Sequence, residues 1–246
     1  MGPAHLVNTR WQDVWSQRTP SDIPHDGGAT LEDLIRADGF NTGFGDITVE
    51  AWSDFVGRTC DVVSLEAGDS LFEVGCGAGA FLYLPSQRGI TVGGIDYSPA
   101  QIETAKRAIP GGTFAVRDAV DLDPTPTADV TIAFSVFQYF SSLDYARRVI
   151  DRMCQKATRA VAILDLPDLQ LADEALNERH AAVGGEAAYV ERYEGLDHLS
   201  FSKEWVRTVL EEQGLQNVTV GPQTVSGYGN GRFRFNAWGW VSSGDH

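Results

Sequence analysis

Short apolar runs alternate, from about residue 70, with segments whose apolar residues recur at helical spacing. This alternation is typical of βαβ units and a parallel sheet. The link between the last two apolar runs is too short for a helix, so these two strands are expected to pair antiparallel. The predicted strands cover residues 71–74, 91–95, 113–116, 129–134, 160–164, 216–225 and 232–241. The sequence therefore predicts a doubly wound α/β protein with a mostly parallel, seven-stranded sheet and an antiparallel last strand.

Helices are predicted between these strands from the positions of apolar and capping residues. Ser98 precedes Pro99, a pair that suits an N-cap followed by the first turn of a helix. Ser202 marks the start of a later helix, which Gly214 ends. The helices expected in this part of the chain cover residues 78–87, 99–109, 143–154 and 203–213.

Residues 1–65 do not show the strand and helix alternation. Apolar spacing there indicates helices over residues 11–17, 31–37 and 50–60, separated by links rich in Pro and Gly. We expect this region to form an N-terminal helical cap on the sheet, with residues 66–246 as the catalytic domain. Within that domain, residues 168–200 are polar and partly helical without a clear core face. They are expected to be an insertion that covers the active site.

Composition narrows the class of partner. The chain has 246 residues, of which 43% are hydrophobic, which suffices for one sizeable core. Its 34 acidic residues outnumber its 19 Lys and Arg, giving a net charge of −15. Nucleic-acid binding draws much of its affinity from Lys and Arg on phosphates, so this balance argues against a nucleic-acid partner. The three cysteines show no CxxC spacing, and no clustered ligands for a metal ion are seen.

The same features predict the compartment. No apolar run approaches the roughly 18 residues that a bilayer-spanning helix needs, and the N-terminus lacks a basic and apolar leader. Free thiols fit a reducing compartment. We therefore expect a cytoplasmic protein without a membrane partner. The sequence leaves the oligomeric state open, a homodimer included.

A glycine-rich turn comes after the first predicted strand, in the stretch LFEVGCGAGAFLYL (residues 71–84). Gly75, Gly77 and Gly79 would let the backbone approach a ligand closely and would open a helix whose amides point at it. Such turns alone are weak evidence, since Gly75, Gly77 and Ala80 also fit the loose fingerprint of a nicotinamide-dependent dehydrogenase. That fingerprint usually opens its domain, whereas about 70 residues precede it here.

Three acids at predicted strand ends make the turn more specific. Glu73 lies inside the first strand between apolar neighbours, where a carboxylate needs a partner that a cationic ligand group would supply. Asp96 ends the second strand, in a position to accept hydrogen bonds from ribose hydroxyls. Asp118 lies after the third strand, where it could accept a hydrogen bond from an adenine amino group.

Four segments, EVGCGAG, GIDYS, RDA and ADVTIAFSVFQYF, together resemble the class I S-adenosylmethionine-dependent methyltransferases in order and spacing. The resemblance implies a Rossmann-like domain with S-adenosyl-L-methionine as cofactor. In this family the first acid and the glycines line the methionine end, the second acid holds the ribose, and the third meets adenine. The cofactor-binding residues so implied are Glu73, Gly75, Gly77, Gly79, Asp96, Tyr97, Asp118, Ala119, Ser135 and Gln138.

The residues directly after the fourth strand indicate the class of acceptor. DNA and protein-glutamine methyltransferases that resemble this core carry Asn/Asp-Pro-Pro-Tyr there, whereas this chain reads SVFQ over residues 135–138. This departure and the acidic charge point to a small-molecule acceptor. Tyr139 could hydrogen-bond the nucleophile or steady the sulfonium through its ring, or it could simply pack under the cap.

Further candidates come from the insertion and from the last hairpin. His180 and His198 could each act as a base near neutral pH, although a lone histidine is more often exposed or structural. Arg232 lies in a glycine-rich link at the same edge and would suit a carboxylate or phosphate, unless that link is an ordinary exposed hairpin. The predicted catalytic residues are Tyr139, His180 and His198. The predicted substrate-binding residues are Phe44, Asp165, Tyr193, Tyr228, Asn230 and Arg232.

Three functions remain open from the sequence. The leading hypothesis is a small-molecule methyltransferase of bacterial secondary metabolism or sugar tailoring, acting by in-line displacement at the sulfonium. A second is transfer or cyclisation of the aminocarboxypropyl arm of the same cofactor, which would release methylthioadenosine. A third is a non-catalytic module that keeps the cofactor pocket.

Overall fold

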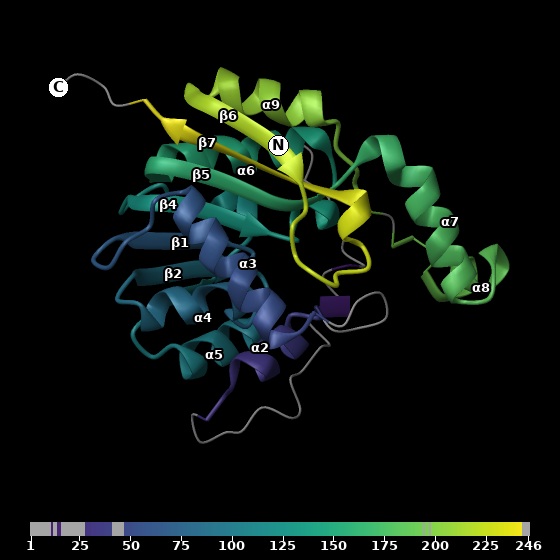
Figure 1. Ribbon diagram of the computed structural model, residues 1–246, viewed down its shortest axis with the longest axis horizontal. Coiled ribbons are helices and arrows are strands. Elements are labelled where there is room, and N and C mark those ends of the chain that lie inside the picture. The colour runs from purple at the N-terminus through teal and green to yellow at the C-terminus, as the bar shows by residue number, and fades with distance from the viewer. Residues whose placement is uncertain are drawn as a thin grey trace, which may run out of the picture.

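The computed structural model describes residues 11, 14–15, 28–40, 47–193, 195–196 and 198–242. Its centre is a seven-stranded sheet with the order β3-β2-β1-β4-β5-β7-β6 (Figure 1). The strands are β1 (Ser70–Val74), β2 (Thr91–Asp96), β3 (Thr113–Val116), β4 (Ala128–Phe134), β5 (Ala157–Pro167), β6 (Leu215–Pro222) and β7 (Arg234–Val241). The strands β1 to β5 pair in parallel, and β7 runs antiparallel to both β5 and β6. The predicted fold class is confirmed.

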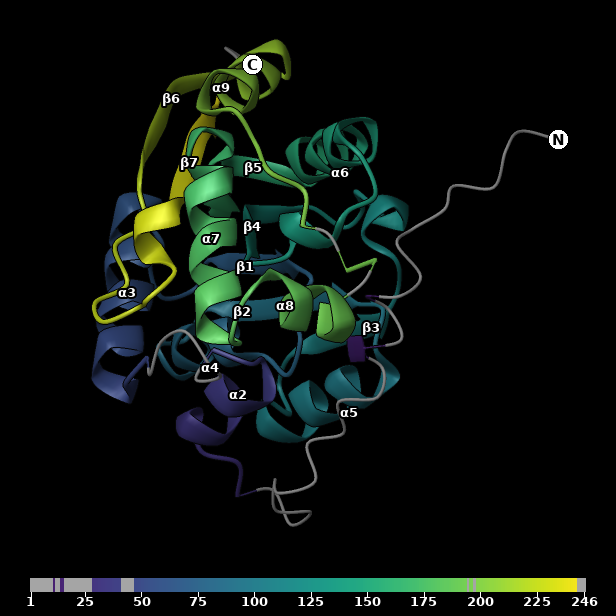
Figure 2. The same ribbon diagram turned by 90° about the vertical axis from the view of Figure 1, so that its right-hand side faces the viewer.

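Helices cover both faces of the sheet. One face carries α2 (Leu31–Ala37), α3 (Val49–Val62), α4 (Ala80–Gln87) and α5 (Pro99–Ala108), and the other carries α6 (Leu143–Lys156) and α9 (Lys203–Glu212). The helices α7 (Ala172–Ala182) and α8 (Glu186–Tyr193) lie across the carboxyl edge of the strands (Figure 2). Four short 3-10 turns are η1 (Ala119–Asp121), η2 (Phe137–Tyr139), η3 (Leu169–Leu171) and η4 (Gly231–Phe233).

Serine N-caps fix the starts of three helices. The side chains of Ser98, Ser142 and Ser202 accept hydrogen bonds from backbone N–H groups in the first turns of α5, α6 and α9. Each cap satisfies a donor that the helix itself leaves unpaired. The helix predicted from residue 78 begins only at Ala80, because Gly79 has the left-handed φ of 91°. That conformation favours glycine and cannot continue an α-helix.

The core is divided by the sheet into two hydrophobic layers. On the face of α2 to α5, Trp52 packs edge-on against Phe134, with ring centroids 5.0 Å apart. On the opposite face, Phe235 is fully buried among residues of α6 and α9. The alternation of side chains along each strand supplies both layers at once. The described part of residues 1–65 shares the first layer and forms no separate core of its own.

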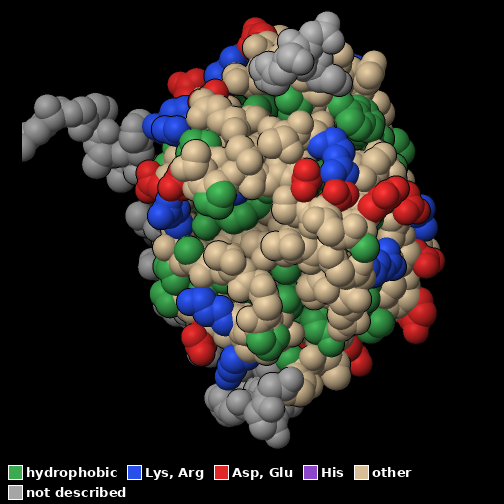
Figure 3. Space-filling model, turned by 90° about the vertical axis from the view of Figure 1, so that its left-hand side faces the viewer, with side chains coloured by type: hydrophobic (Ala, Val, Ile, Leu, Met, Phe, Trp, Pro, Cys, Tyr) green, Lys and Arg blue, Asp and Glu red, His purple; other side chains and the backbone are tan. Residues whose placement is uncertain are grey.

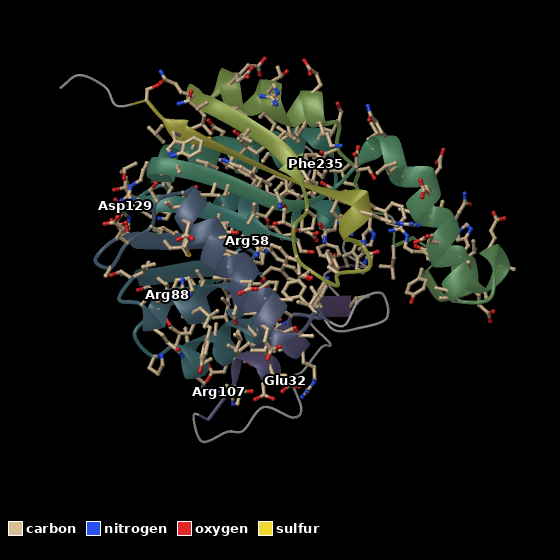
Figure 4. The ribbon with its side chains drawn as sticks, in the orientation of Figure 1. Glu32, Arg58, Arg88, Arg107, Asp129 and Phe235 are labelled. Atoms are coloured by element: carbon tan, nitrogen blue, oxygen red, sulfur yellow. The ribbon has the colours of Figure 1, made fainter. Side chains whose placement is uncertain are left out.

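The N-terminal helices are also tied to the site by hydrogen bonds. The indole Nε1 of Trp52 on α3 donates to the carbonyl of Ala80 at 3.1 Å, at the start of α4. Arg58, on the same helix, donates to the carbonyl of Thr224 at 3.1 Å (Figure 4). Since Ala80 comes directly after the glycine turn and Thr224 leads into the last hairpin, α3 holds two segments of the carboxyl edge in place.

Two predicted strand bounds are wrong by a few residues at this edge. The strand predicted over 216–225 ends at Pro222, and the strand predicted from 232 begins at Arg234. The cause is the 3-10 turn Gly231–Phe233, which keeps Arg232 out of the sheet. The shift matters because it changes which arginine faces the cavity.

Figure 3 shows the opposite, amino edge of the sheet, where acidic and basic side chains lie next to one another. Here Arg159 pairs with Asp69 at 2.7 Å and with Asp129 at 3.4 Å. These charges are partly exposed, so they contribute only modestly to stability. Within the described ranges, no helix combines the length and the apolar character that crossing a bilayer requires.

Candidate active site

A cavity of about 320 Å³ opens at the carboxyl edge of the sheet. In parallel sheets, this edge is where ligands bind. Ser135, after β4, and Asp165, near the end of β5, both border this region with positive φ values of 53° and 63°. Such backbone strain in residues other than glycine is a feature of functional sites.

The glycine turn between β1 and α4 forms one wall of the cavity. Gly75 and Gly77 have φ values of 73° and 51°. A Cβ at Gly75 would lie only 2.5 Å from Cγ2 of Val136. The amides of Gly75 and Cys76 donate to the carbonyl of Ile95 at 2.8 Å and 3.0 Å, which anchors the turn on β2. The turn is therefore anchored, and side chains from other segments pack closely on its backbone, which only glycine allows.

An acid from the N-terminal helices caps this turn. Asp38, directly after α2, accepts hydrogen bonds from the amides of Ala78 at 2.6 Å and Ala80 at 3.1 Å. A Cβ at Gly77 would collide with the same carboxylate. The position favours a negative charge because unpaired amides at a helix start carry partial positive charge. The sequence motifs do not mark Asp38 as a site residue.

Two further acids, Glu73 and Asp96, lie close to Asp38, and Glu73 lacks a hydrogen-bond partner for one of its oxygens among the described residues. Glu73 is 3% exposed, and its Oε2 has no hydrogen-bond partner among the residues that the structure describes. Burial, and then the charges of Asp38 and Asp96, raise the pKa of Glu73 well above its usual range. Asp96 accepts from the amides of Gly77 at 3.1 Å and Ser98 at 2.8 Å. Burial nevertheless raises the pKa of Asp96 to about 6.

A smaller cavity of about 40 Å³ adjoins the first beside Asp96 and Tyr97. It is lined mainly by apolar groups, together with Asp118 and Ala119. The hydroxyl of Tyr145 and the amide of Val120 both donate to Asp118, so this carboxylate is held in place. The sequence predicts Tyr145 only as part of a helix. Its role at Asp118 depends on how α6 packs beside the third strand.

After β4, a glutamine organises the rim. The Nε2 of Gln138 donates to the carbonyl and to Oγ of Ser135, at 2.7 Å and 2.9 Å. Its Oε1 is buried without a partner in the described part of the chain. Because the amide nitrogen is fully used, the free group that Gln138 offers is a hydrogen-bond acceptor.

Near the other end of the cavity, Asp165 is fully buried, and both of its carboxylate oxygens have hydrogen-bond donors. Its carboxylate accepts from Nε2 of Gln223 at 2.9 Å and from the hydroxyl of Tyr228 at 3.2 Å. Burial and the neighbouring Asp165 raise the pKa of Tyr228 far above its ordinary value, so its hydroxyl stays protonated. Arg234 lines the cavity beside them and donates to the carbonyl of Asp165 at 3.3 Å.

His198 meets the cavity from the segment after α8. Nη1 of Arg179 lies 3.0 Å from its Nδ1. A guanidinium can only donate, so Nδ1 is the acceptor and the imidazole proton is on Nε2. That Nε2 is buried without a partner among the described residues. Burial, Arg234 and Arg179 lower the pKa of His198 to about 3, so the ring is neutral and unsuited to accept a proton.

The comparisons with known proteins agree with this geometry. Residues 72–162 match a sequence family described as a methyltransferase domain. The matched stretch is 91 of the 246 residues and runs from β1 into β5. A stretch of 96 residues is 31% identical to trans-aconitate 2-methyltransferase of Rhizobium etli, and the match covers 38% of this chain and 38% of that relative.

Solved structures of methyltransferases share the fold of the whole domain. The magnesium protoporphyrin IX methyltransferase of Synechocystis, with bound S-adenosylmethionine, superposes with a TM-score of 0.62 at 15% identity. That likeness covers 98% of this chain and 100% of the other. The N-methyltransferase NodS of Bradyrhizobium japonicum, in complex with S-adenosylhomocysteine, gives 0.61 at 16% identity over 89% and 100% of the two chains.

Most residues predicted for the methyltransferase site border the main cavity. Those that line it are Glu73, Gly75, Gly77, Asp96, Tyr97, Ser135, Gln138, Tyr139, Tyr193, His198, Tyr228 and Asn230. Asp118 and Ala119 line the smaller cavity instead. Gly79 shapes the start of α4 without lining either, and Asp165 acts behind Tyr228. Phe44 lies outside the described residues.

Two predicted residues lie away from the main cavity. His180 on α7 packs against Tyr189 on α8, with ring centroids 4.8 Å apart, and does not line the cavity. Arg232 is 54% exposed and pairs with Glu178 and with Glu174, the latter at 3.6 Å, on the outer side of α7. The sequence places both in the correct segments, but only the packing of α7 decides which way they face.

The sequence missed several residues that line the cavity. These are Trp11, Trp15, Asp38, Phe40, Gln101 and Arg234. Most lie in the N-terminal region, which the recognised motifs do not cover. Arg234 could have been found from the alternation RFRFN, since Arg234 and the buried Phe235 point to opposite sides of β7.

The residues at the glycine turn fit S-adenosylmethionine. The buried, unpaired oxygen of Glu73 lines the cavity and requires a cationic or donor group, which the ammonium and sulfonium of the cofactor provide. The glycine turn, which lines the cavity, suits the amino-acid portion. Asp96 and the smaller cavity with Asp118 come next, in the order that a ribose and an adenine would need.

Proposed function

We propose that this protein transfers the methyl group of S-adenosylmethionine to a small-molecule acceptor. The observation that carries the proposal is the carboxylate of Glu73, buried beside two further acids with one oxygen unpaired. An unpaired buried charge is costly in a protein without its ligand. A cationic cofactor at this position removes that cost.

The proposed roles divide between the two cavities. Glu73 would bind the cationic methionine portion together with the free Oε1 of Gln138. Asp96 would hold the ribose, and Asp118, positioned by Tyr145, would meet the adenine between Tyr97 and Ala119. When bound, the cofactor supplies a methyl group on a cationic sulfur, and the reaction is a displacement at that methyl carbon.

The chain's own contribution is to orient the acceptor and exclude water. Tyr139 lies at the junction of the two cavities and is the residue best placed to position the nucleophile. His198 would act as a hydrogen-bond donor through Nε2–H and not as a base, because its pKa is lowered to about 3. His198 would therefore not remove a proton from the acceptor atom during the reaction.

A small molecule is the acceptor class that best suits a cavity closed by aromatic side chains. Relatives named for trans-aconitate and for magnesium protoporphyrin IX support this class. A role in bacterial secondary metabolism or sugar tailoring, in the cytoplasm, is the finer proposal. Whether the protein acts as a monomer or a homodimer does not affect it.

Product analysis tests the proposal. The protein is incubated with S-adenosylmethionine, with and without pools of small-molecule acceptors, and the nucleoside product is identified. S-adenosylhomocysteine formed only when an acceptor is present is the expected result. If methylthioadenosine forms without an acceptor, the protein does not transfer the methyl group but transfers or cyclises the aminocarboxypropyl arm. Cofactor binding without any nucleoside product in any pool would favour a non-catalytic module.

A further inference from the structure

Two guanidinium groups meet at the end of the cavity formed by β5, β7 and the segment after α8. Arg234 is the first residue of β7 and lines the cavity. Arg179, on α7, lies behind His198 and contacts its Nδ1 at 3.0 Å. Burial, and to a smaller extent the positive charge of Arg234, lowers the pKa of Arg179. This concentration of positive charge contrasts with a chain whose net charge is −15.

The charges at this end do not balance. Neither Arg179 nor Arg234 forms an ion pair with a carboxylate in the described part of the chain. Arg234 donates to the backbone carbonyl of Asp165, and both carboxylate oxygens of Asp165 already accept hydrogen bonds from Gln223 and Tyr228. With His198 neutral, the described residues place two guanidiniums and one carboxylate here, and one positive charge has no carboxylate partner among them. A buried group of this kind requires a counter-ion.

Hydrogen-bond donors also remain unused here. The Nε2–H of His198 has no partner among the described residues. Arg234 uses one of its donors on the carbonyl of Asp165, and a guanidinium has five. The acids of the cofactor end offer acceptors, whereas this end offers donors. The cavity is therefore polarised along its length, from acids at the glycine turn to cations at β7.

We infer that the acceptor carries a carboxylate, which Arg234 and the Nε2–H of His198 bind at this end of the cavity. The inference rests on the proposed function and names the substrate class for the same site. A planar guanidinium matches the two oxygens of a carboxylate, and the imidazole N–H supplies a third bond. The single uncompensated charge suits a monoanion better than a phosphate dianion.

The walls beside these donors indicate the body of the acceptor. The ring of His198 stacks on Trp11 with centroids 4.8 Å apart and an interplanar angle of 10°. Tyr139 meets the His198 ring edge-on at 5.5 Å. Tyr228 lines the cavity from the hairpin side. The rings of Trp11, Tyr139 and His198 pack on one another and form an aromatic wall. Flat apolar groups pack well against such a wall, so the acceptor class is an aromatic or otherwise planar carboxylic acid.

The test uses the full chain saturated with S-adenosylhomocysteine and measures probe binding by calorimetry. Benzoate is the probe, and benzamide is its neutral counterpart of the same shape. Benzoate is expected to bind at least about tenfold more tightly than benzamide. In Arg234→Gln that preference should fall by at least about tenfold, and in Arg234→Lys by less. Arg232→Gln, two residues away and paired on the outside of α7, should keep the preference unchanged.

Each outcome decides. Equal binding of benzoate and benzamide, or an unchanged preference in Arg234→Gln, overturns the inference. If phenyl phosphate binds more tightly than benzoate, the inference of a carboxylate is overturned and the site prefers a phosphate. If circular dichroism shows that Arg234→Gln does not fold, the benzoate preference is measured in Arg234→Lys instead, where it should still fall. Failure of S-adenosylhomocysteine itself to bind would reject the proposed function, a result seen before any acceptor probe is added.

Discussion

Glu73 lines the cavity and Asp165 lies behind Tyr228; both acids are buried, but their surroundings are opposite. Asp165, at the acceptor end, accepts two side-chain hydrogen bonds and lies near Arg234. Glu73, at the cofactor end, has an unpaired oxygen and two acidic neighbours. The protein itself supplies hydrogen-bond donors to Asp165, whereas Glu73 needs a ligand to supply one. Burial alone thus does not mark a ligand site; the missing partner does.

The same contrast separates the two ends of the cavity as a whole. The cofactor end gathers Asp38, Glu73 and Asp96 around an anchored turn, which favours a cation. The acceptor end gathers Arg179 and Arg234 around a neutral histidine, which favours an anion. Substitutions at the two ends should therefore affect the binding of different ligands, the cofactor at one end and the acceptor at the other.

Asp165→Ala should have the largest effect, on stability. It leaves the donors of Gln223 and Tyr228 unpaired and Arg234 uncompensated, so the free energy of unfolding should fall by about 3–5 kcal/mol. Asp165→Asn keeps an acceptor and tolerates the positive φ, and should lose less. Urea denaturation measures both. A loss below about 1 kcal/mol for Asp165→Ala would show that this acid is not the internal partner described here.

Asp96→Ala should act on the cofactor. Removing charge-assisted hydrogen bonds worth about 1.5–3 kcal/mol should weaken S-adenosylmethionine binding by about ten- to a hundredfold. Asp129→Ala, at the opposite edge of the sheet (Figure 4), is the matched control and should bind as the parent does. Calorimetry that finds parental affinity in Asp96→Ala would remove the ribose assignment.

The cofactor motif and the succession of strands along the chain could be predicted from sequence because they depend on local patterns. The glycine turn and the acids lie within or just after apolar runs that mark strands, and Ser98 and Ser202 mark the starts of helices. The acceptor end could not be predicted in the same way. Choosing Arg234 over Arg232 needed the bounds of β7, and the tautomer of His198 needed its contact with Arg179. Both depend on segments distant in sequence.

Glu73→Gln should separate stability from binding. The folded-state pKa of Glu73 is raised, so the folded protein holds that proton more tightly than the unfolded chain. Stability from this group is therefore present at low pH and is lost as pH rises. As the pH is raised from about 5 to about 8, the variant should lose less stability than the parent, and it should bind S-adenosylmethionine more weakly. Parallel pH profiles for the two proteins would count against the unpaired carboxylate.

Arg232→Gln should have the smallest effect. Its ion pairs with Glu174 and Glu178 are about half exposed, so the unfolding free energy should change by less than about 0.5 kcal/mol. Binding of S-adenosylmethionine should not change. Thermal unfolding and calorimetry measure the two quantities, and a clear loss of either would mean that Arg232 contributes to the cavity after all.

The most direct test of the central claim, that buried acids hold a cationic cofactor, is calorimetric titration with S-adenosylmethionine across pH. Burial raises the pKa of Asp96 to about 6 and raises that of Glu73 well above its usual range, so both groups must lose a proton to hold the cation as carboxylates. Affinity should rise with pH through about 6, with protons released on binding, and should then level off. Affinity that is independent of pH between about 5 and about 8, or binding of nicotinamide dinucleotide in its place, would contradict the account.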